Sequence, residues 1–266
     1  MTAGPDAWTA GTAYEQYMGR WSRPAADRFV RWLDGPDGLR WLDLGCGTGA
    51  LTAAVSAHRH PALVLGLDRS PAFVADARAA APAPARFLVG DAQELPVRDG
   101  GCDAVVSGLA LNFLPDPEAA LAEATRAVRP GGLVGAFVWD YAGGMEFLRR
   151  FWDAAVAVDP AAGDLDEGRR FRVCRPEPLR ALWTRAGLVD VVLTAIDVPT
   201  VFADFDDLWT PFLGGQGPAP TYVTGLPPRA RARLRTALRA AVPPDGNGTI
   251  PLTARAWAIR GRAPTR

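Results

Sequence analysis

Hydrophobic residues gather in short, evenly spaced runs through the first half of the chain. Two of these runs, 62–67 and 133–139, are continuously apolar, which is typical of strands buried on both faces of a parallel sheet. Similar runs predict strands at 39–44, 86–89 and 103–107. Segments with helical periodicity separate most of them, and the links are short. This alternation predicts an α/β fold built on a doubly wound parallel sheet.

The second half of the chain is less regular. Its patterns predict helices at 145–158 and 178–186, and strands at 189–198 and 253–260. Between these strands, the segment 203–248 holds an aromatic helix, a Gly/Pro loop and an arginine-rich helix. Before the first strand, the segment 13–33 is helical, and Pro24 either separates two helices there or starts the second.

Charge and composition narrow the classes of partner. Acidic and basic residues balance at 29 each, so bulk charge gives no argument for nucleic acid or a membrane surface. No window approaches the ~20 apolar residues that span a bilayer, and the N-terminus lacks a signal-peptide pattern. Three scattered cysteines without zinc spacing predict reduced thiols in a cytoplasmic protein, and no bound metal. We interpret the arginines of 229–239 as a solvated helix face rather than an RNA-binding one.

Glycines at 45, 47 and 49 lie between the first predicted strand and the helix after it. Glycine is entropically costly to order, so this spacing indicates that a ligand approaches the backbone here. The amides that open the next helix favour a polar or anionic group. A nicotinamide-binding turn has the spacing GxGxxG, whereas this turn is GxGxG and follows Asp43. A carboxylate there repels a pyrophosphate and suits an ammonium group, which disfavours a nicotinamide dehydrogenase.

Several motifs on these elements match one known pattern. Leu42–Gly49 resembles the first motif of class I S-adenosylmethionine (SAM) dependent methyltransferases. Three later motifs resemble those of the quinone-biosynthesis C-methyltransferase group, at Gly90–Pro96, Leu114–Leu121 and Arg129–Gly132. Tyr17–Ser22 resembles the N-terminal helices of a bacterial, small-molecule branch of that group.

The resemblance implies a Rossmann-like, mostly parallel sheet of seven strands with an antiparallel last strand, N-terminal helices and a small helical cap. It implies a single domain over 1–266, with N-terminal helices at 13–33 and a cofactor-binding core at 39–140. The segments 141–186 and 203–248 are expected to shape the acceptor site. The implied cofactor is SAM, which leaves as S-adenosylhomocysteine. Monomer and homodimer both stay open.

The same resemblance implies roles for the glycine turn. The amides of Gly45, Gly47 and Gly49 would line the methionine part of SAM, and Asp43 would lie near its ammonium group. Cys46 belongs to this cofactor-binding turn, where we interpret it as a small filler rather than a nucleophile.

Further cofactor contacts are implied at the ends of later strands. Asp68 would accept hydrogen bonds from both ribose hydroxyls, with Arg69 along the ribose or adenine edge. Asp91 would accept one from the adenine amino group, and the backbone of Ala92 would face the ring. Ser107 would offer its carbonyl to the ammonium group.

Some of these assignments have structural alternatives. Arg20 is implied to pair with the methionine carboxylate, but it fits an ordinary surface charge equally well. Asp68 fits a cap for the next helix, although Ser70 is available for that. Asp91 fits a plain strand end.

A general base is hard to find in this sequence. The only histidines, His58 and His60, follow the helix after the glycine turn, so we expect them at the opposite edge of the sheet. Many relatives have a histidine where this chain has Leu111–Phe113. The remaining catalytic candidates follow the fifth strand, and they are Asp140, Tyr141 and Glu146. Asp140 also fits a helix cap. We therefore expect catalysis mainly by positioning of the acceptor.

Aromatic residues in 13–33, 141–160 and 203–225 predict a small apolar or aromatic acceptor, methylated on oxygen or carbon. The alternative is that these rings form core. Two rival functions also stay open. One is a SAM-binding enzyme of this fold that catalyses cyclisation or elimination, and the other is a non-catalytic binding protein.

Overall fold

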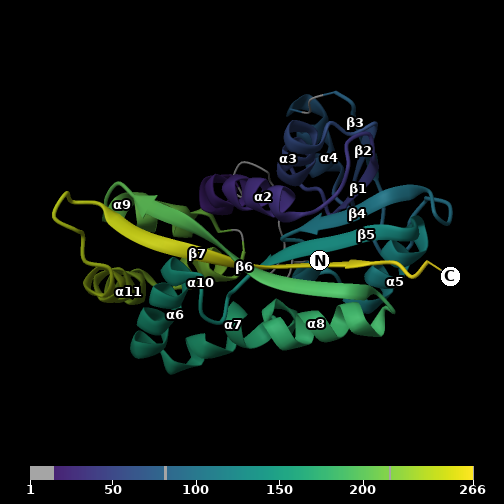
Figure 1. Ribbon diagram of the computed structural model, residues 1–266. Coiled ribbons are helices and arrows are strands. Elements are labelled where there is room, and N and C mark those ends of the chain that lie inside the picture. Colours follow the sequence, from purple (N-terminus) through teal and green to yellow (C-terminus); the bar gives the residue numbers. More distant parts are fainter. Residues whose placement is uncertain (1–14, 81–82, 216, 266) are drawn as a thin grey trace. The chain divides into compact units, whose positions relative to one another are not determined.

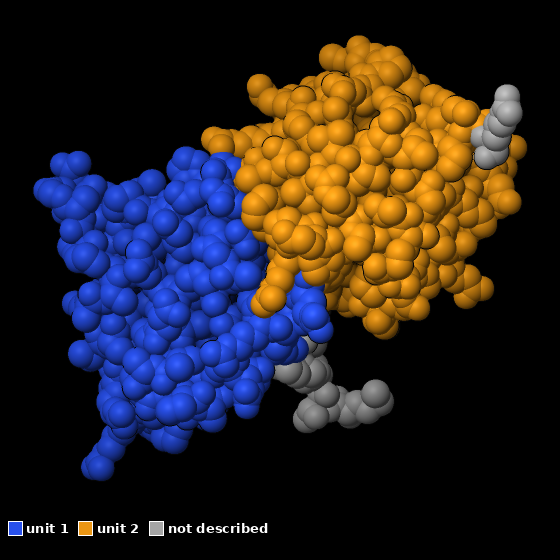
Figure 2. Space-filling view, turned by 60° about the horizontal axis from the view of Figure 1, so that its bottom comes forward, with its two compact units in different colours: residues 1–21, 139–172, 197–256 blue, residues 22–138, 173–196, 257–266 orange. Residues whose placement is uncertain are grey.

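The computed structural model describes residues 15–80, 83–215 and 217–265. The chain divides into two compact units, which Figure 2 colours separately. Unit 1 consists of Met1–Trp21, Trp139–Arg172 and Asp197–Ala256. Unit 2 consists of Ser22–Val138, Val173–Ile196 and Trp257–Arg266. The predicted helical positions 13 and 14 lie outside the described residues.

The first half of the chain alternates strand and helix as predicted (Figure 1). Its elements are β1 (Arg40–Leu44), α3 (Ala50–Arg59), β2 (Leu63–Asp68), α4 (Pro71–Ala80), β3 (Ala85–Val89), β4 (Cys102–Gly108), η2 (Leu111–Phe113), α5 (Pro117–Ala127) and β5 (Val128–Trp139). Strands β1 to β5 pair in parallel. The predicted parallel sheet is therefore confirmed, and its strand boundaries shift by a residue or two except at the start of β5.

Two long strands complete a seven-stranded sheet in the order β3-β2-β1-β4-β5-β7-β6. They are β6 (Val189–Phe202) and β7 (Ile250–Arg262). The Gly131 amide donates to the Ala263 carbonyl, and the Asp140 amide donates to the Arg255 carbonyl. Residue numbers rise along β5 as they fall along β7, so these strands are antiparallel. The mixed sheet with an antiparallel end is confirmed.

The start of β5 corrects one prediction. The sequence placed a helix-ending turn at Pro130–Gly132 and the strand only from Leu133 onward. The strand instead begins at Val128, directly after α5. The amide of Gly131 and the carbonyl of Gly132 both bond to Ala263, so the turn residues are part of the sheet. Pairing with a strand far along the chain overrides their local turn preference.

The N-terminal helices also differ from expectation. A π-helical turn, η1 (Glu15–Gly19), precedes α2 (Arg20–Trp32). Pro24 lies inside α2 rather than at a boundary. A proline inside a helix removes one backbone donor. The π turn directly before α2 also departs from the α-helical hydrogen-bond pattern, so this part of the chain is irregular on both counts.

The second half contains short helices. They are α6 (Glu146–Val158), η3 (Pro160–Asp164), α7 (Glu167–Arg170), η4 (Arg172–Cys174), α8 (Pro176–Arg185), α9 (Phe205–Trp209), η5 (Thr210–Gly214), α10 (Pro218–Gly225) and α11 (Pro228–Ala241). The predicted Gly/Pro loop is wrong at α10, which is helical. Both of its prolines, Pro218 and Pro220, fall in its first turn, where a missing amide donor costs little.

The core of unit 2 forms around β5. The Phe29 ring of α2 lies 4.9 Å from the Phe137 ring of β5. The indole of Trp183 from α8 is fully buried and donates to the Val134 carbonyl at 3.2 Å. Aromatic side chains from two helices therefore hold β5 in place, and with it the position of its carboxyl end.

The glycine turn gives a first test of the fold. Gly45 has φ +69°, and an added Cβ there would lie 2.4 Å from the Cβ of Ala110. We expect Gly45→Ala to lower the free energy of unfolding by roughly 3 kcal/mol, through backbone strain plus the clash. Gly38→Ala is the matched control, because Gly38 has φ +78° with nothing within 4 Å of the added Cβ. Urea denaturation measures both, and equal losses would contradict the role of the contact with Ala110.

Candidate functional site

Four of the predicted cofactor residues come together at one edge of the sheet in unit 2. Asp43, Asp68 and Ser107 lie in the last two residues of β1, β2 and β4, and Asp91 follows β3 by two residues. These strands are neighbours in the sheet and run parallel. Their carboxyl ends therefore meet at one edge, where ligands bind in doubly wound folds.

Asp43 is the most unusual of these residues because its carboxylate is completely buried in the middle of the sheet. It is paired with Gly66 of β2 and Val106 of β4. The Thr52 hydroxyl of α3 donates to Oδ2 at 2.7 Å. The other oxygen, Oδ1, is buried and has no hydrogen-bond partner among the described residues. Thr52 was not predicted, since only the fold brings it to Asp43.

Burial raises the pKa of Asp43 to about 7, an effect that the Thr52 hydrogen bond opposes and the Asp68 charge reinforces. A carboxylate oxygen without a donor is costly inside a protein. A cation beside Oδ1 would remove that cost and lower the pKa. Asp43 is therefore well suited to bind a positively charged group through Oδ1.

The glycine turn folds back on the strand ends. The amides of Gly45 and Cys46 both donate to the Leu67 carbonyl, and the Gly49 amide donates to the Cys46 carbonyl. The Gly47 amide donates to Oδ2 of Asp68 at 2.9 Å. All of these amides thus have partners inside the protein. Gly47 also borders open space, because nothing lies within 4 Å of an added Cβ.

Cys46 fills space beneath this turn. Its thiol is buried, and an added Cβ on Gly66 would lie 3.0 Å from its sulfur. Burial raises the pKa of this thiol far above its usual value. Because the thiolate is the reactive form, Cys46 is a poor nucleophile here.

Asp68 joins the turn to the next helix. Its Oδ1 accepts from the Ser70 amide at 2.8 Å, while Oδ2 holds Gly47. The Ser70 hydroxyl in turn accepts from the Phe73 amide. Asp68 therefore has a structural role as well as a position beside the turn. Arg69, next in the chain, has an exposed side chain.

Asp91 and Ala92 differ in exposure. Asp91 is exposed, and its Oδ1 accepts from the Gln93 amide at 2.9 Å, whereas Ala92 is buried. Ser107 is buried, and its hydroxyl donates to the Leu44 carbonyl at 2.8 Å. This bond ties the ends of β1 and β4 together beside Asp43.

Arg20 belongs to unit 1. Its guanidinium forms a two-pronged ion pair with Asp207, at 2.7 and 3.0 Å. The same group lies 4.3 Å from the Trp21 ring centroid and 5.0 Å from that of Phe202. The ion pair lowers the pKa of Asp207. The positive charge of Arg20 is therefore already matched within its own unit.

The three catalytic candidates also lie in unit 1, and each carboxylate among them has backbone partners. Asp140 accepts from the amides of Gly143 and Gly144, at 3.1 and 2.9 Å. Glu146 accepts from the Thr253 amide at 2.7 Å. Tyr141 is buried, with its ring 5.5 Å from that of Phe171. Neither carboxylate caps α6, whose N-cap is Met145 without a side-chain cap bond, so the helix-cap alternative for Asp140 is wrong. Asp140 instead holds the turn before the helix, and Glu146 binds the backbone of β7.

A buried carboxyl that the sequence did not reveal lies nearby in unit 1. Glu167 of α7 is 2% exposed and accepts a hydrogen bond from the indole of Trp152. Burial raises its pKa to about 7. Burial, with the Glu167 charge as the smaller cause, raises the phenol pKa of Tyr17. Tyr17 belongs to the N-terminal motif, but Glu167 belongs to none, so only the packed structure identifies the pair.

This burial predicts how stability depends on pH. The folded pKa of Glu167, about 7, lies above the unfolded value of 4.5. Its contribution to stability is therefore fully present below pH 4.5 and is lost as the pH rises through 7. At pH 8 we expect the free energy of unfolding of Glu167→Gln to exceed that of wild type by at least ~2 kcal/mol, because an amide still accepts from Trp152 without ionising.

Urea denaturation at pH 5 and pH 8 measures this effect. The control is Glu177→Gln, since Glu177 is exposed on α8; it should change stability little at either pH. A Glu167→Gln variant that loses the same stability at both pH values would show that its ionisation does not matter.

Other predicted groups fall outside the sheet edge described above. His58 lies 3.1 Å from Asp27, and His60 lies 3.3 Å from Asp37. The His60 carbonyl accepts from the Gly38 amide, just before β1, which places it at the amino ends of the strands. Within the described ranges, no helix is long and apolar enough to cross a membrane, and no cluster of three metal-ligating side chains occurs.

The arginines of α11 are largely engaged within unit 1. Arg235 and Arg239 both lie near Asp206, with nitrogen–oxygen distances of 2.6 and 3.7 Å. Arg231 donates to the carbonyls of Val223 and Leu226, at the end of α10. These contacts are those of a helix anchored on its neighbours.

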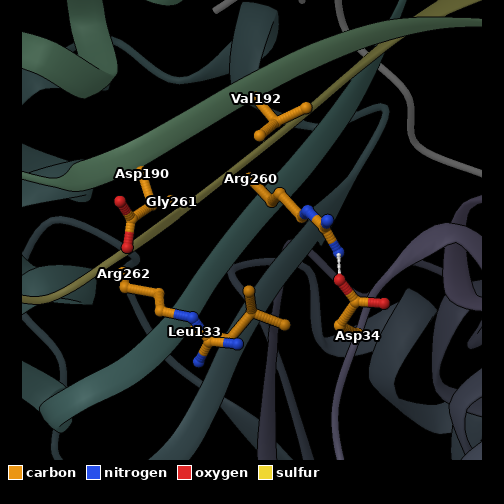
Figure 3. A pocket seen from close by; sticks show the side chains of 7 residues that line it. All are labelled: Asp34, Leu133, Asp190, Val192, Arg260, Gly261 and Arg262. Atoms are coloured by element: carbon orange, nitrogen blue, oxygen red, sulfur yellow. Dashed lines mark ion pairs between the residues drawn. The ribbon is translucent and has the colours of Figure 1, made fainter.

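One pocket of unit 2 lies elsewhere, on the strands at the other end of the sheet (Figure 3). Its lining is Asp34, Leu133, Asp190, Val192, Arg260, Gly261 and Arg262. The Arg260 guanidinium pairs with Asp34 at 2.5 Å across it. None of the predicted site residues lines this pocket.

Comparison with known proteins gives one consistent answer. A family model described as a methyltransferase domain matches residues 42–136. Trans-aconitate 2-methyltransferase of Methylobacterium radiotolerans is 32% identical over 188 residues, which cover 68% of this chain and 70% of that protein. The enzyme of the same name from Deinococcus radiodurans is 39% identical over 134 residues, covering 50% and 48%. The chain thus spans about half the length of that relative.

A solved structure supports the fold. The YcgJ protein from Bacillus subtilis superposes with a TM-score of 0.60 at 18% identity, covering 91% of this chain and 98% of that one. The identity is too low to carry more than the fold. The family model, however, begins in β1 and ends in β5, so it contains the glycine turn and all four strand ends described above. This chain belongs to the class I S-adenosylmethionine-dependent methyltransferases.

Proposed function

We propose that the chain transfers the methyl group of SAM to oxygen or carbon of a small, apolar or aromatic acceptor. Catalysis is proposed to come mainly from positioning the acceptor against the methyl group. The observation that carries this proposal is the buried Oδ1 of Asp43, which lacks a partner at the carboxyl edge of the sheet. When bound, SAM supplies a methyl group activated by its sulfonium.

The described residues fit this cofactor. Oδ1 of Asp43 suits the ammonium group, and the open space beside Gly47 leaves the turn accessible. Asp68 offers a carboxylate for the ribose hydroxyls, with exposed Asp91 for the adenine amino group. Arg20 is the poorest fit of the proposed set, because Asp207 already holds it.

The acceptor is proposed to lie against the aromatic segments 13–33, 141–160 and 203–225, as the sequence leads us to expect. Their rings pack tightly on one another, since Phe151 stacks on Phe212 at 4.4 Å and Tyr17 meets Phe212 edge-on at 5.5 Å. Much of this cluster is therefore core, and it offers an apolar wall. Asp140 and Glu146 are held by backbone amides, which favours positioning over strong base catalysis.

The test is incubation of the protein with SAM labelled in its methyl group and a panel of hydroquinones and small carboxylic acids. Label in the acceptor, together with S-adenosylhomocysteine, is the expected result. Conversion of a compound without S-adenosylhomocysteine would support cyclisation or elimination instead. Absence of SAM binding by calorimetry would support a non-catalytic binding protein and overturn the proposal.

A further inference from the structure

Asn112 carries a carboxamide that the fold leaves unsatisfied. It lies in η2, four residues after the end of β4. Both its Oδ1 and its Nδ2 are buried, and neither has a hydrogen-bond partner among the described residues. A carboxamide provides two donor hydrogens and an acceptor oxygen, and leaving both ends unpaired inside a protein is costly. A native chain that keeps such a group invites a functional explanation.

The segment that holds Asn112 is tightly fixed. Leu109 has φ +59°, a conformation that bulky residues rarely adopt, and its amide donates to the Phe137 carbonyl at 2.8 Å. The Phe113 amide donates to the Ala110 carbonyl at 2.9 Å. Strain that is held in place by surrounding contacts clusters at binding sites.

This segment also lies directly against the glycine turn. Ala110 approaches Gly45 so closely that any side chain at Gly45 would clash with it. Both lie within unit 2, and η2 follows the carboxyl end of β4, as Asp91 follows that of β3. The unsatisfied carboxamide therefore lies two residues along the chain from Ala110, the residue that contacts the glycine turn.

We propose that the Asn112 carboxamide binds the methyl acceptor through a group that both donates and accepts a hydrogen bond, namely a hydroxyl or a protonated carboxyl. The proposal rests on the proposed function and names the class of its acceptor. A cofactor carboxylate only accepts and would satisfy Nδ2 alone, whereas an ammonium only donates and would satisfy Oδ1 alone. A hydroxyl-bearing group satisfies both atoms of the side chain at once.

The decisive variant is Asn112→Leu, which keeps the size of the side chain and removes both polar atoms. In the ligand-free protein we expect the melting temperature to rise by about 2–4 °C, because the desolvation cost disappears. Asn247→Leu is the control, because Asn247 is the only other asparagine and is exposed; it should show no rise. A lower melting temperature for Asn112→Leu would show that Asn112 is structural and overturn the proposal.

Binding measurements complete the test. The affinities of Asn112→Leu for SAM and S-adenosylhomocysteine should stay within twofold of wild type; a tenfold loss would assign the carboxamide to the cofactor and overturn the proposal. With S-adenosylhomocysteine present, wild type should bind hydroquinone at least tenfold more tightly than 1,4-dimethoxybenzene, and Asn112→Leu should lose this preference. Wild type without the preference, or a variant that keeps it, would also overturn the proposal. None of these outcomes would contradict the proposed function, which the methyl-transfer assay tests separately.

Discussion

Asp68→Ala should weaken SAM binding at least 100-fold. The variant removes the carboxylate proposed for the ribose hydroxyls, and hydrogen bonds to a charged group contribute about 1.5–3 kcal/mol each. It also leaves the amides of Gly47 and Ser70 without the acceptors that shape the turn. Two lost bonds of this size correspond to two or more factors of ten in affinity. Isothermal titration calorimetry with SAM measures the loss directly.

The matched control is Asp103→Ala. Asp103 lies at the other end of β4, where Arg40 and Arg129 hold its carboxylate, and these contacts lower its pKa to about 2. Its removal should cost stability but change SAM affinity less than twofold. An Asp68→Ala protein that melts normally and binds SAM like wild type would refute the placement of the ribose at the end of β2.

SAM affinity should also rise with pH, tenfold per unit well below pH 7, and then level off. The reason is that Asp43 has a pKa of about 7 in the ligand-free fold and must lose its proton to receive an ammonium group. Binding below pH 7 should therefore release a proton. The same raised pKa also affects stability: the contribution of Asp43 is fully present below its unfolded pKa of 3.8 and is lost as the pH rises through 7.

Titration calorimetry in buffers of different ionisation enthalpy measures both the affinity and the released proton. Asp43→Asn should bind SAM weakly with a flat pH profile, since its amide does not titrate in this range. Asp103→Asn should keep the wild-type profile. If Asp43→Asn retained the pH dependence, the titrating group would have to lie elsewhere.

The sequence was enough to predict the sheet and the edge at which the proposed cofactor residues gather. Continuous apolar runs such as 62–67 mark strands buried on both faces, and residues at the ends of parallel neighbours must meet at one edge. Asp43 and Asp68 were found in this way, because each follows from its position in a strand. Local turn chemistry was a poorer guide: Gly131 and Gly132 form part of β5 because Ala263, far along the chain, pairs with them.

The residues that the sequence did not reveal owe their character to burial. In the sequence, Glu167 is an ordinary acidic residue at the start of a helix. In the fold, Trp152 and the surrounding core enclose it. Asn112 was notable only as part of Leu111–Phe113, the segment in which many relatives have a histidine, and its unsatisfied carboxamide is a property of the packed fold. Which polar group is enclosed depends on contacts between distant segments, and no periodicity or motif spacing encodes it.

The distribution of the cysteines has a practical consequence. Cys46, Cys102 and Cys174 are all buried, none forms a disulfide, and all three belong to unit 2. A thiol-alkylating reagent reaches them only when that unit opens, so the rate of labelling reports the opening of unit 2 alone. Because Cys46 sits in the glycine turn, its labelling in particular gives a footprint of the turn. The chain thus carries its own chemical probe, with no need for an introduced dye or a tryptophan signal that both units share.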